Sequence, residues 1–293
     1  MCISYLLYTH NNIYFKYIIK TKNILKLKKI GVVTKFGSID SENVAEQIVR
    51  KTTKLGILSY ATASMKNAIK VESVDELHNK KLDMVITLGG DGTTLRAFRQ
   101  LQNEVPILTI NVGGNRGILS EIKKEQIDQA LKQIMNGNIF LDKRLRVVAE
   151  LNGKEFQPAL NEIYINRKNL TKTSEFTIRF QNDTVKQKMD GVIIATPSGS
   201  TGHSFSLGGP ILHESLNTLI ITPVAPVYGL ESIVVPAKKI QVDCSHDCNI
   251  VMDAQVIESA GFEETITIKK YKKQAVFIRL KKRGLRQMNR LGF

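Results

Sequence analysis

The distribution of apolar residues changes near residue 143, and this change constrains the fold more than any other feature of the chain. Between residues 29 and 142, short β-branched runs alternate with segments whose apolar residues recur at helical spacing. After residue 143, mostly short β-branched runs follow one another closely. The first pattern predicts a Rossmann-like α/β domain with a parallel sheet, and the second predicts a β-rich, β-sandwich-like domain.

The elements of the first domain are predicted from the same patterns. Strands are expected at 29–33, 84–88 and 106–112, and helices after the N-cap region 38–41, at 93–102 and at 123–137. A second αβ pair is expected around 55–60 and 65–69. In the last helix, Ile127, Leu131 and Ile134 would share one apolar face.

Four segments are distinguished along the chain. Residues 1–28 lack glycine, proline and acids, and they are either a poorly ordered extension or an upstream start with no assigned role. Residues 29–142 form the predicted α/β domain, and residues 143–270 form the predicted β-rich domain. Residues 271–293 are expected to form a strand and a basic amphipathic helix that packs back on the first domain.

The net charge of +15 comes from the two ends of the chain. Residues 1–29 contain six Lys, residues 269–293 contain ten Lys or Arg, and neither segment contains an acid. The remainder is nearly neutral, with 26 basic and 27 acidic residues. This distribution favours solvated terminal faces over a nucleic-acid-binding surface, although a polyanion-binding tail stays open as an added property.

Composition and cysteine usage favour a cytoplasmic protein. No stretch reaches the roughly 18 uncharged apolar residues that a membrane helix needs. Cys2, Cys244 and Cys248 are too few for a disulfide framework. Together with His246, the last two could offer three zinc ligands on one face of a strand, but no fourth partner is visible, so no protein-bound metal is predicted.

The segment ITLGGDGTTLRAF at residues 86–98 places a glycine-rich turn between a predicted strand and a predicted helix. Bare glycine backbone and a helix N-terminus suit phosphates. The lysine of a P-loop is absent, however, and residues 31–41 lack a Rossmann dinucleotide fingerprint. Asp91 could accept or orient the proton of an attacking hydroxyl or hold Mg²⁺, or it could simply cap the helix.

Three further segments carry candidate binding groups. Residues 190–210 combine an apolar strand with six small hydroxyl side chains and five glycines, so they form either a ligand loop or a long flexible connection. Residues 111–117, NVGGNRG, are either an anion contact or a turn. The pair Asn161–Glu162 could hold a base edge and a ribose diol, or it could face solvent on a strand.

Taken in order, the segments GGDGTTLRA, NVGGNRGIL, LNEIYI, DGVIIATPSGSTGHSFSLGGPIL, ITPVAP and VMDAQ resemble those of the NAD kinase family. The resemblance runs from about residue 29 to the C-terminus. It implies an enzyme that phosphorylates the 2′-hydroxyl of the adenosine ribose of NAD, using ATP and Mg²⁺ or another divalent cation. It also implies a site between the two domains and a homo-oligomer.

The resemblance also implies roles for individual residues. Asp91 matches the aspartate that contacts the 2′-hydroxyl, and Asn161 and Glu162 match the pair that holds the adenosine. The remaining predicted binding residues are Gly90, Gly92, Thr93, Arg96, Lys188, Asp190, Ser198, Thr201, Gly202, His203 and Ser206.

The chain departs from the family pattern at a few positions. Gly202 and His203 replace the usual alanine and tyrosine, Ile118 replaces a phenylalanine, and Ala254 replaces a glycine. We expect none of these to touch Asp91 or the Asn–Glu pair. A lipid or sugar kinase that shares the GGDG loop and a non-catalytic dinucleotide sensor are the rival interpretations.

Overall fold

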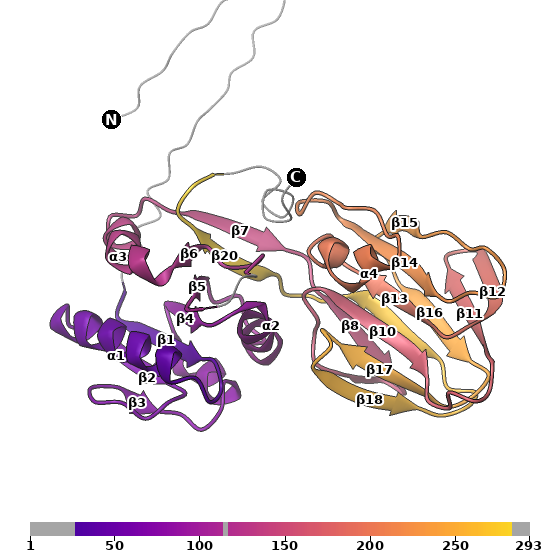
Figure 1. The fold of residues 1–293 in the computed structure, drawn as a ribbon, viewed down its shortest axis with the longest axis horizontal. Helices are drawn as coiled ribbons and strands as arrows, with labels where there is room; N and C mark the ends of the chain where they lie inside the picture. Colours follow the sequence, from indigo (N-terminus) through magenta and orange to yellow (C-terminus); the bar gives the residue numbers. More distant parts are fainter. Residues whose placement is uncertain (1–26, 114–116, 283–293) are drawn as a thin grey trace, which may run out of the picture.

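A mixed sheet forms the centre of the first domain in the computed structural model, which describes residues 27–113 and 117–282 (Figure 1). Its strand order is β3-β2-β1-β4-β5-β20-β7, and β6 pairs with β5. The strands are β1 (Lys29–Thr34), β2 (Leu58–Ala61), β3 (Ile69–Lys70), β4 (Met84–Leu88), β5 (Ile107–Asn111), β6 (Ile122–Lys123), β7 (Phe140–Arg144) and β20 (Ala275–Arg279). All pairs except β20 with β7 are parallel, which confirms the predicted sheet.

Helices cover both faces of this sheet. The apolar sides of α1 (Ile39–Lys54) and α3 (Ile127–Met135) pack on one face, where Ile48, Ile134 and Val32 share a buried cluster. The helix α2 (Asp91–Gln100) packs on the other face, where Phe98 contacts Phe277 with ring centroids 4.6 Å apart. Side chains on β1 alternate between these two clusters, as the pleat of a strand requires.

Two local predictions in this domain need correction. The αβ pair expected around 55–60 and 65–69 contains no helix: the first segment runs into the strand β2, and Ile69 begins the short strand β3. The helix predicted at 123–137 is shorter: residues 124–126 form a 3₁₀ turn, closed by a hydrogen bond from the backbone N–H of Lys123 to Gln126 Oε1. The three apolar residues predicted to share its buried face, from Ile127 to Ile134, are buried as expected.

Two six-stranded antiparallel sheets form the second domain. One has the order β15-β14-β13-β10-β17-β18 and the other has the order β12-β11-β16-β19-β8-β9. Their strands are β8 (Val147–Leu151), β9 (Lys154–Glu155), β10 (Glu162–Arg167), β11 (Ser174–Phe180), β12 (Asp183–Met189), β13 (Gly191–Ala195), β14 (Thr218–Val224), β15 (Ile233–Pro236), β16 (Ile240–Cys244), β17 (Cys248–Met252), β18 (Val256–Ala260) and β19 (Ile266–Lys270). The β-rich prediction is confirmed.

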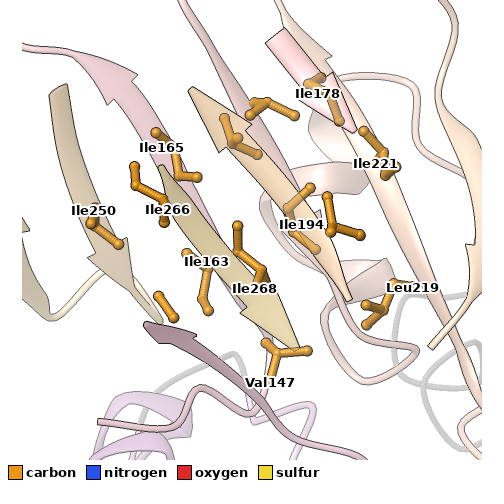
Figure 2. Packing of buried hydrophobic residues seen from close by; sticks show 14 of the residues in the cluster. Val147, Ile163, Ile165, Ile178, Ile194, Leu219, Ile221, Ile250, Ile266 and Ile268 are labelled. Atoms are coloured by element: carbon orange, nitrogen blue, oxygen red, sulfur yellow. The ribbon is translucent and has the colours of Figure 1, made fainter. Parts of the chain in front are cut away.

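The core of the second domain lies between these sheets. Ile163, Ile165 and Ile194 from one sheet meet Ile178 and Ile268 from the other in a single buried cluster (Figure 2). Fully burying each such side chain contributes about 1.5–3 kcal/mol. This packing fixes the ends of β10 and β13, from which the candidate site is built.

The segment VDCSHDC turns from one sheet to the other. Cys244 ends β16 and Cys248 begins β17, so the two thiols do not alternate along a single strand as expected. Both are buried in the core, while the Nδ1 atom of His246 lies 3.1 Å from the hydroxyl of Ser245. Across the described part of the chain, no three His, Cys, Asp or Glu residues are grouped to hold a metal.

Two strands join the domains. The chain enters the second domain after β7 and returns through β20, which lies between β5 and β7. Asp142 Oδ2 accepts hydrogen bonds from Arg144 Nη2 at 2.8 Å and Arg279 Nε at 3.0 Å. Burial alone would raise the pKa of Asp142, but the two guanidinium groups hold it below its ordinary value. The helix predicted after β20 falls largely on residues 283–293, outside the described residues.

Candidate active site

The glycine-rich turn lies at the carboxyl end of β4 and leads directly into α2. Gly89 has φ +154°, and a Cβ there would lie 2.4 Å from the hydroxyl of Thr93, so glycine is required. Thr93 is buried against this turn and lies in the first turn of the helix. The positive dipole end of α2 lies at this turn, beyond the end of β4, which suits an anionic group.

Asp91 is the first residue of α2, and Gly90 occupies the N-cap position. The interpretation of Asp91 as a capping residue is therefore wrong. Its Oδ1 accepts the backbone N–H of Leu119 at 2.9 Å, and its Oδ2 accepts that of Ile118 at 3.1 Å. The expectation that no departure from the family pattern touches Asp91 is also wrong, because Ile118 makes one of these bonds through its backbone.

The pair Asn161–Glu162 lies where the chain enters β10. Asp253 fixes its backbone: Oδ1 accepts the N–H groups of Asn161 at 2.7 Å and Glu162 at 3.3 Å, and Oδ2 accepts that of Leu160 at 3.0 Å. Glu162 is only 5% exposed, which excludes a solvent-facing strand pair. Asn161 Oδ1 and Glu162 Oε2 are buried with no hydrogen-bond partner among the described residues, so both can receive a ligand's donors.

Burial controls the protonation of Glu162 and of Asp253, which holds its backbone. The pKa of Glu162 is raised to about 8, first by burial and then by the charge of Asp253. Burial also raises the pKa of Asp253 to about 6, although three backbone hydrogen bonds oppose that shift. At neutral pH, Asp253 is therefore mostly ionised and Glu162 mostly protonated. A protonated Glu162 can both donate and accept, as a ribose diol requires.

The segment 190–210 is folded tightly against the pair. The backbone N–H of Thr196 donates to Asn161 O at 2.8 Å, and its hydroxyl donates to Leu160 O at 2.5 Å. A Cβ on Gly199 would lie 2.2 Å from Asn161 O, so only glycine allows this approach. A 3₁₀ turn (Gly199–Thr201) and the short helix α4 (His203–Ser206) follow. The interpretation of this segment as a flexible connection is wrong.

Several predicted binding residues line this folded segment. A Cβ on Gly202 would lie 3.5 Å from Glu162 Oε2, so the segment faces the carboxyl group directly. The ring of His203 meets that of Tyr164 edge-on, with centroids 5.2 Å apart. The hydroxyl of Ser206 is exposed and donates to His203 O at 2.7 Å.

The buried hydroxyl residues of this segment face a different group. Ser198 and Thr201 are both buried in the loop. The hydroxyl of Ser198 accepts from Arg144 Nη1 at 3.4 Å, which connects the loop to the pair of strands that joins the domains.

Three predicted residues lie farther from this cluster. Arg96 on α2 donates to Thr34 O at 2.7 Å, and its Nε is buried without a partner among the residues described. Asp190 pairs with Arg167 at 2.8 Å, and Lys188 is exposed on β12. No contact in the described part of the chain joins the side chain of Lys188 to the Asn–Glu pair, so its role stays a prediction.

Sequence reasoning did not assign the residues that join the two halves of the site. Gln255 Nε2 donates to Gly92 O at 2.8 Å, while its Oε1 accepts from Arg99 Nη1 at 2.5 Å. Asp253, two positions earlier, holds the Asn–Glu pair. The signal of Asp253 and Gln255 in the sequence was the segment VMDAQ, where the two polar residues follow an apolar run. Contacts through residues 253–255 thus connect the Asp91 turn with the Asn161–Glu162 pair.

Comparisons with known proteins identify the family of the chain. A family model described as the ATP-NAD kinase N-terminal domain matches residues 25–139, and one described as the C-terminal domain matches residues 160–280. The chain is 32% identical over 274 residues to an NAD kinase from Methanosarcina mazei, covering 90% of this chain and 93% of that protein. An NAD kinase from Pyrococcus abyssi is 31% identical, over 72% of this chain and 78% of that protein.

Solved structures show the same fold. An NAD kinase from Archaeoglobus fulgidus in complex with ATP has a TM-score of 0.73 at 29% identity, covering 90% of this chain and 97% of that chain. Yeast NADH kinase complexed with NADH has a TM-score of 0.82 at 16% identity, covering 91% of this chain and 88% of that chain, a likeness of fold. The two family models and the identity shared with the archaeal enzymes show that this chain belongs to the NAD kinase family.

Proposed function

We propose that the protein transfers the γ-phosphoryl group of ATP to the 2′-hydroxyl of the adenosine ribose of NAD, which yields NADP and ADP. The observation that carries this proposal is the connection between the two halves of the site. Gln255 contacts the turn that contains Asp91, and Asp253 holds the Asn161–Glu162 pair. Relatives named as NAD kinases, one of them solved with ATP, support the choice of substrates.

In this proposal Asp91 acts on the attacking hydroxyl. Each carboxylate oxygen accepts one backbone N–H and keeps further lone-pair capacity for a ligand. In the proposed step, the 2′-oxygen forms a bond to the γ-phosphorus, the bond from that phosphorus to the ADP oxygen breaks, and the hydroxyl proton moves to Asp91. The N-terminus of α2 and the glycine amides would stabilise the phosphate charge.

The opposite half of the site suits the adenosine. Asn161 Oδ1 and Glu162 Oε2 are buried acceptors without partners among the residues described, and the protonated Glu162 also offers a donor. A ribose diol and a base edge present complementary donors and acceptors. His203 and Tyr164 add an aromatic wall beside this pair.

A divalent cation, Mg²⁺ or another, fits this site as a companion of ATP. Mg²⁺ commonly uses one or two carboxylates together with substrate phosphates and water. In this proposal Asp91, at the start of α2, would supply the carboxylate and the nucleotide phosphates would supply the other ligands. The ion would neutralise charge on the triphosphate when bound.

We also propose a homo-oligomer that works in the cytoplasm. The oligomer is expected from the family resemblance, and size-exclusion chromatography with light scattering tests it. The location is supported by two cysteine thiols, Cys244 and Cys248, that are free and buried. Among the residues that the structure describes, no helix is long and apolar enough to cross a membrane.

Asp91→Asn tests the proposed chemistry. The asparagine keeps one acceptor for the N–H groups of Ile118 and Leu119 but is a poor proton acceptor. We expect turnover in a coupled assay of ATP, NAD and Mg²⁺ to fall by about 10²–10⁴-fold while NAD binding in calorimetry persists. Asp128→Asn, on the exposed side of α3, is the matched control. Near-normal turnover of Asp91→Asn would exclude the assigned role.

The rival functions give different results in the same assays. A lipid or sugar kinase would phosphorylate diacylglycerol or a sugar and leave NAD unchanged. A dinucleotide sensor would bind NAD saturably and form no NADP. The tight packing of residues 196–199 against Asn161 favours a nucleotide over a lipid, because it places polar backbone beside the buried acceptors.

A further inference from the structure

The turn between β17 and β18 has an unusual backbone. Asp253 and Ala254 have φ values of +49° and +53°, and the N–H of Gln255 donates to Met252 O at 3.0 Å. Two successive left-handed residues are typical of a type I′ turn, which favours Asn-Gly or Asp-Gly. Alanine is strained in this region. Such strain persists where the surrounding contacts fix the conformation, and here those contacts reach both halves of the site.

Asp253, on one side of this turn, holds the backbone of the half of the site proposed to bind the adenosine. Asp253 is 3% exposed, and its carboxylate accepts three successive backbone N–H groups, from Leu160 to Glu162. In return, the N–H of Asp253 donates to Glu162 O at 3.1 Å. The entrance to β10 therefore cannot shift without moving the turn.

The other side of the turn reaches the phosphate half. Part of Gln255 is exposed, but both ends of its amide are engaged, with Gly92 O and with Arg99. Gly92 directly follows Asp91, and a Cβ on Gly92 would lie 3.3 Å from Gln255 Nε2. The amide thus contacts the first turn of α2 at the residue next to the proposed proton acceptor.

Arg99 holds the amide of Gln255 from the opposite direction. Arg99 is 4% exposed, and its guanidinium donates to two neutral side chains, Gln255 Oε1 at 2.5 Å and Gln157 Oε1 at 2.9 Å. Burial lowers the pKa of Arg99, and the charges of Asp253 and Asp75 only partly oppose that shift. Burying a cation against neutral amides is costly. We take the function of the buried Arg99 to be the orientation of Gln255, because its guanidinium is held rigidly against the amide.

We propose that Gln255, held by Arg99, is a positioning residue that sets the location of the Asp91 turn relative to the Asn161–Glu162 pair. This inference rests on the proposed kinase function. The acceptor hydroxyl would be carried by the nucleotide held at β10, whereas the group that receives its proton is carried by α2. Gln255 and Asp253, two residues apart, contact both. Reaction rates are sensitive to displacements of about 1 Å between such groups, which cost on the order of 10²-fold.

Gln255→Met tests the proposal, because methionine keeps the length of the side chain and removes both hydrogen bonds. We expect kcat to fall by about 10–100-fold with KM for NAD changed less than about threefold. Gln255→Glu keeps an acceptor for Arg99 but places a carboxylate against Gly92 O, so it should keep the thermal midpoint and still lose kcat. Gln157→Met is the matched control, because it removes the other amide of Arg99 without touching Gly92.

The outcomes separate the inference from the function on which it depends. An active wild-type chain whose Gln255→Met and Gln255→Glu variants keep normal kcat refutes the positioning role alone. If kcat and the thermal midpoint fall together in all three variants, Gln157→Met included, the role of Gln255 is merely structural. That outcome also refutes the positioning role. A wild-type chain that forms no NADP from ATP and NAD refutes the proposed function, and the inference fails with it.

Discussion

Replacing Asp253 by asparagine perturbs the point where the adenosine half of the site is held. The aspartate receives three backbone N–H groups at 2.7–3.3 Å in a buried position. An asparagine can keep one oxygen toward Asn161 and Glu162, but its NH₂ group would then face the N–H of Leu160. Two donors, the NH₂ group of the asparagine and the N–H of Leu160, would then face each other, and the N–H of Leu160 would lose its acceptor.

The expected free-energy change follows from these contacts. One unsatisfied buried N–H costs about 1–3 kcal/mol, and weakening two charge-assisted hydrogen bonds to neutral ones costs about 1 kcal/mol each. Removing a buried charge offsets part of this loss. We expect the free energy of unfolding to fall by about 2–4 kcal/mol. The pKa of Glu162 should fall as well, because burial remains but the charge of Asp253 is gone.

Urea unfolding measures the first quantity, and the pH dependence of NAD binding reports the second. Asp247→Asn is the matched control, because Asp247 Oδ1 accepts a single exposed N–H, that of Phe262, at 3.2 Å at the other end of β17. We expect this control to change stability by less than about 1 kcal/mol. If Asp253→Asn behaved like the control, or left the NAD-binding pH profile unchanged, the role assigned to Asp253 would be refuted.

Two more predictions concern the same region. Ala254→Gly should raise the free energy of unfolding by about 0.5–1 kcal/mol, because glycine adopts φ +53° without strain. The thermal midpoint of Ala254→Gly should rise by about 1–3 °C. The reverse change, Gly153→Ala at φ +80° in the turn between β8 and β9, should lower the thermal midpoint. An unchanged midpoint in both variants would contradict the strain argument. Glu162→Gln should flatten the pH dependence of stability between pH 6 and 8. Because the folded pKa of Glu162, about 8, lies above its ordinary value of 4.5, its stabilisation is full below pH 4.5 and is lost as the pH rises through 8. Equal slopes in wild type and variant would show that Glu162 does not titrate there.

The local patterns of the sequence were sufficient for much of the fold. The buried strand β4, the turn at Gly89 and the start of α2 follow from an apolar run, glycines and a helical repeat that are contiguous in the chain. The αβ pair predicted around 55–60 and 65–69 was wrong because the structure has two paired strands there, β2 and β3, and pairing between strands has no local signature. The early start of α2 was missed because glycine, not a side-chain cap, precedes it.

The site was predictable only where its chemistry is local. Asp91 and the Asn–Glu pair stood out by residue type, but the sequence alone left a capping role for Asp91 open. Its partners, the N–H groups of Ile118 and Leu119, lie 27 and 28 residues away, and any residue could supply them. Gln255 was not assigned because its contact with Gly92 spans 163 residues. Backbone partners at such separations carry no signature in the sequence.

The position of β20 has a consequence for biosynthesis. This strand lies between β5 and β7, so the sheet of the first domain is completed by residues 275–279, which are made after the whole second domain (Figure 1). Proteins usually fold from the N-terminus as the chain emerges from the ribosome. Here β5 cannot pair with β20 until residues 275–279 have been synthesised. The sheets of the second domain use only residues 147–270, so all their strands are available before the sheet of the first domain can be completed.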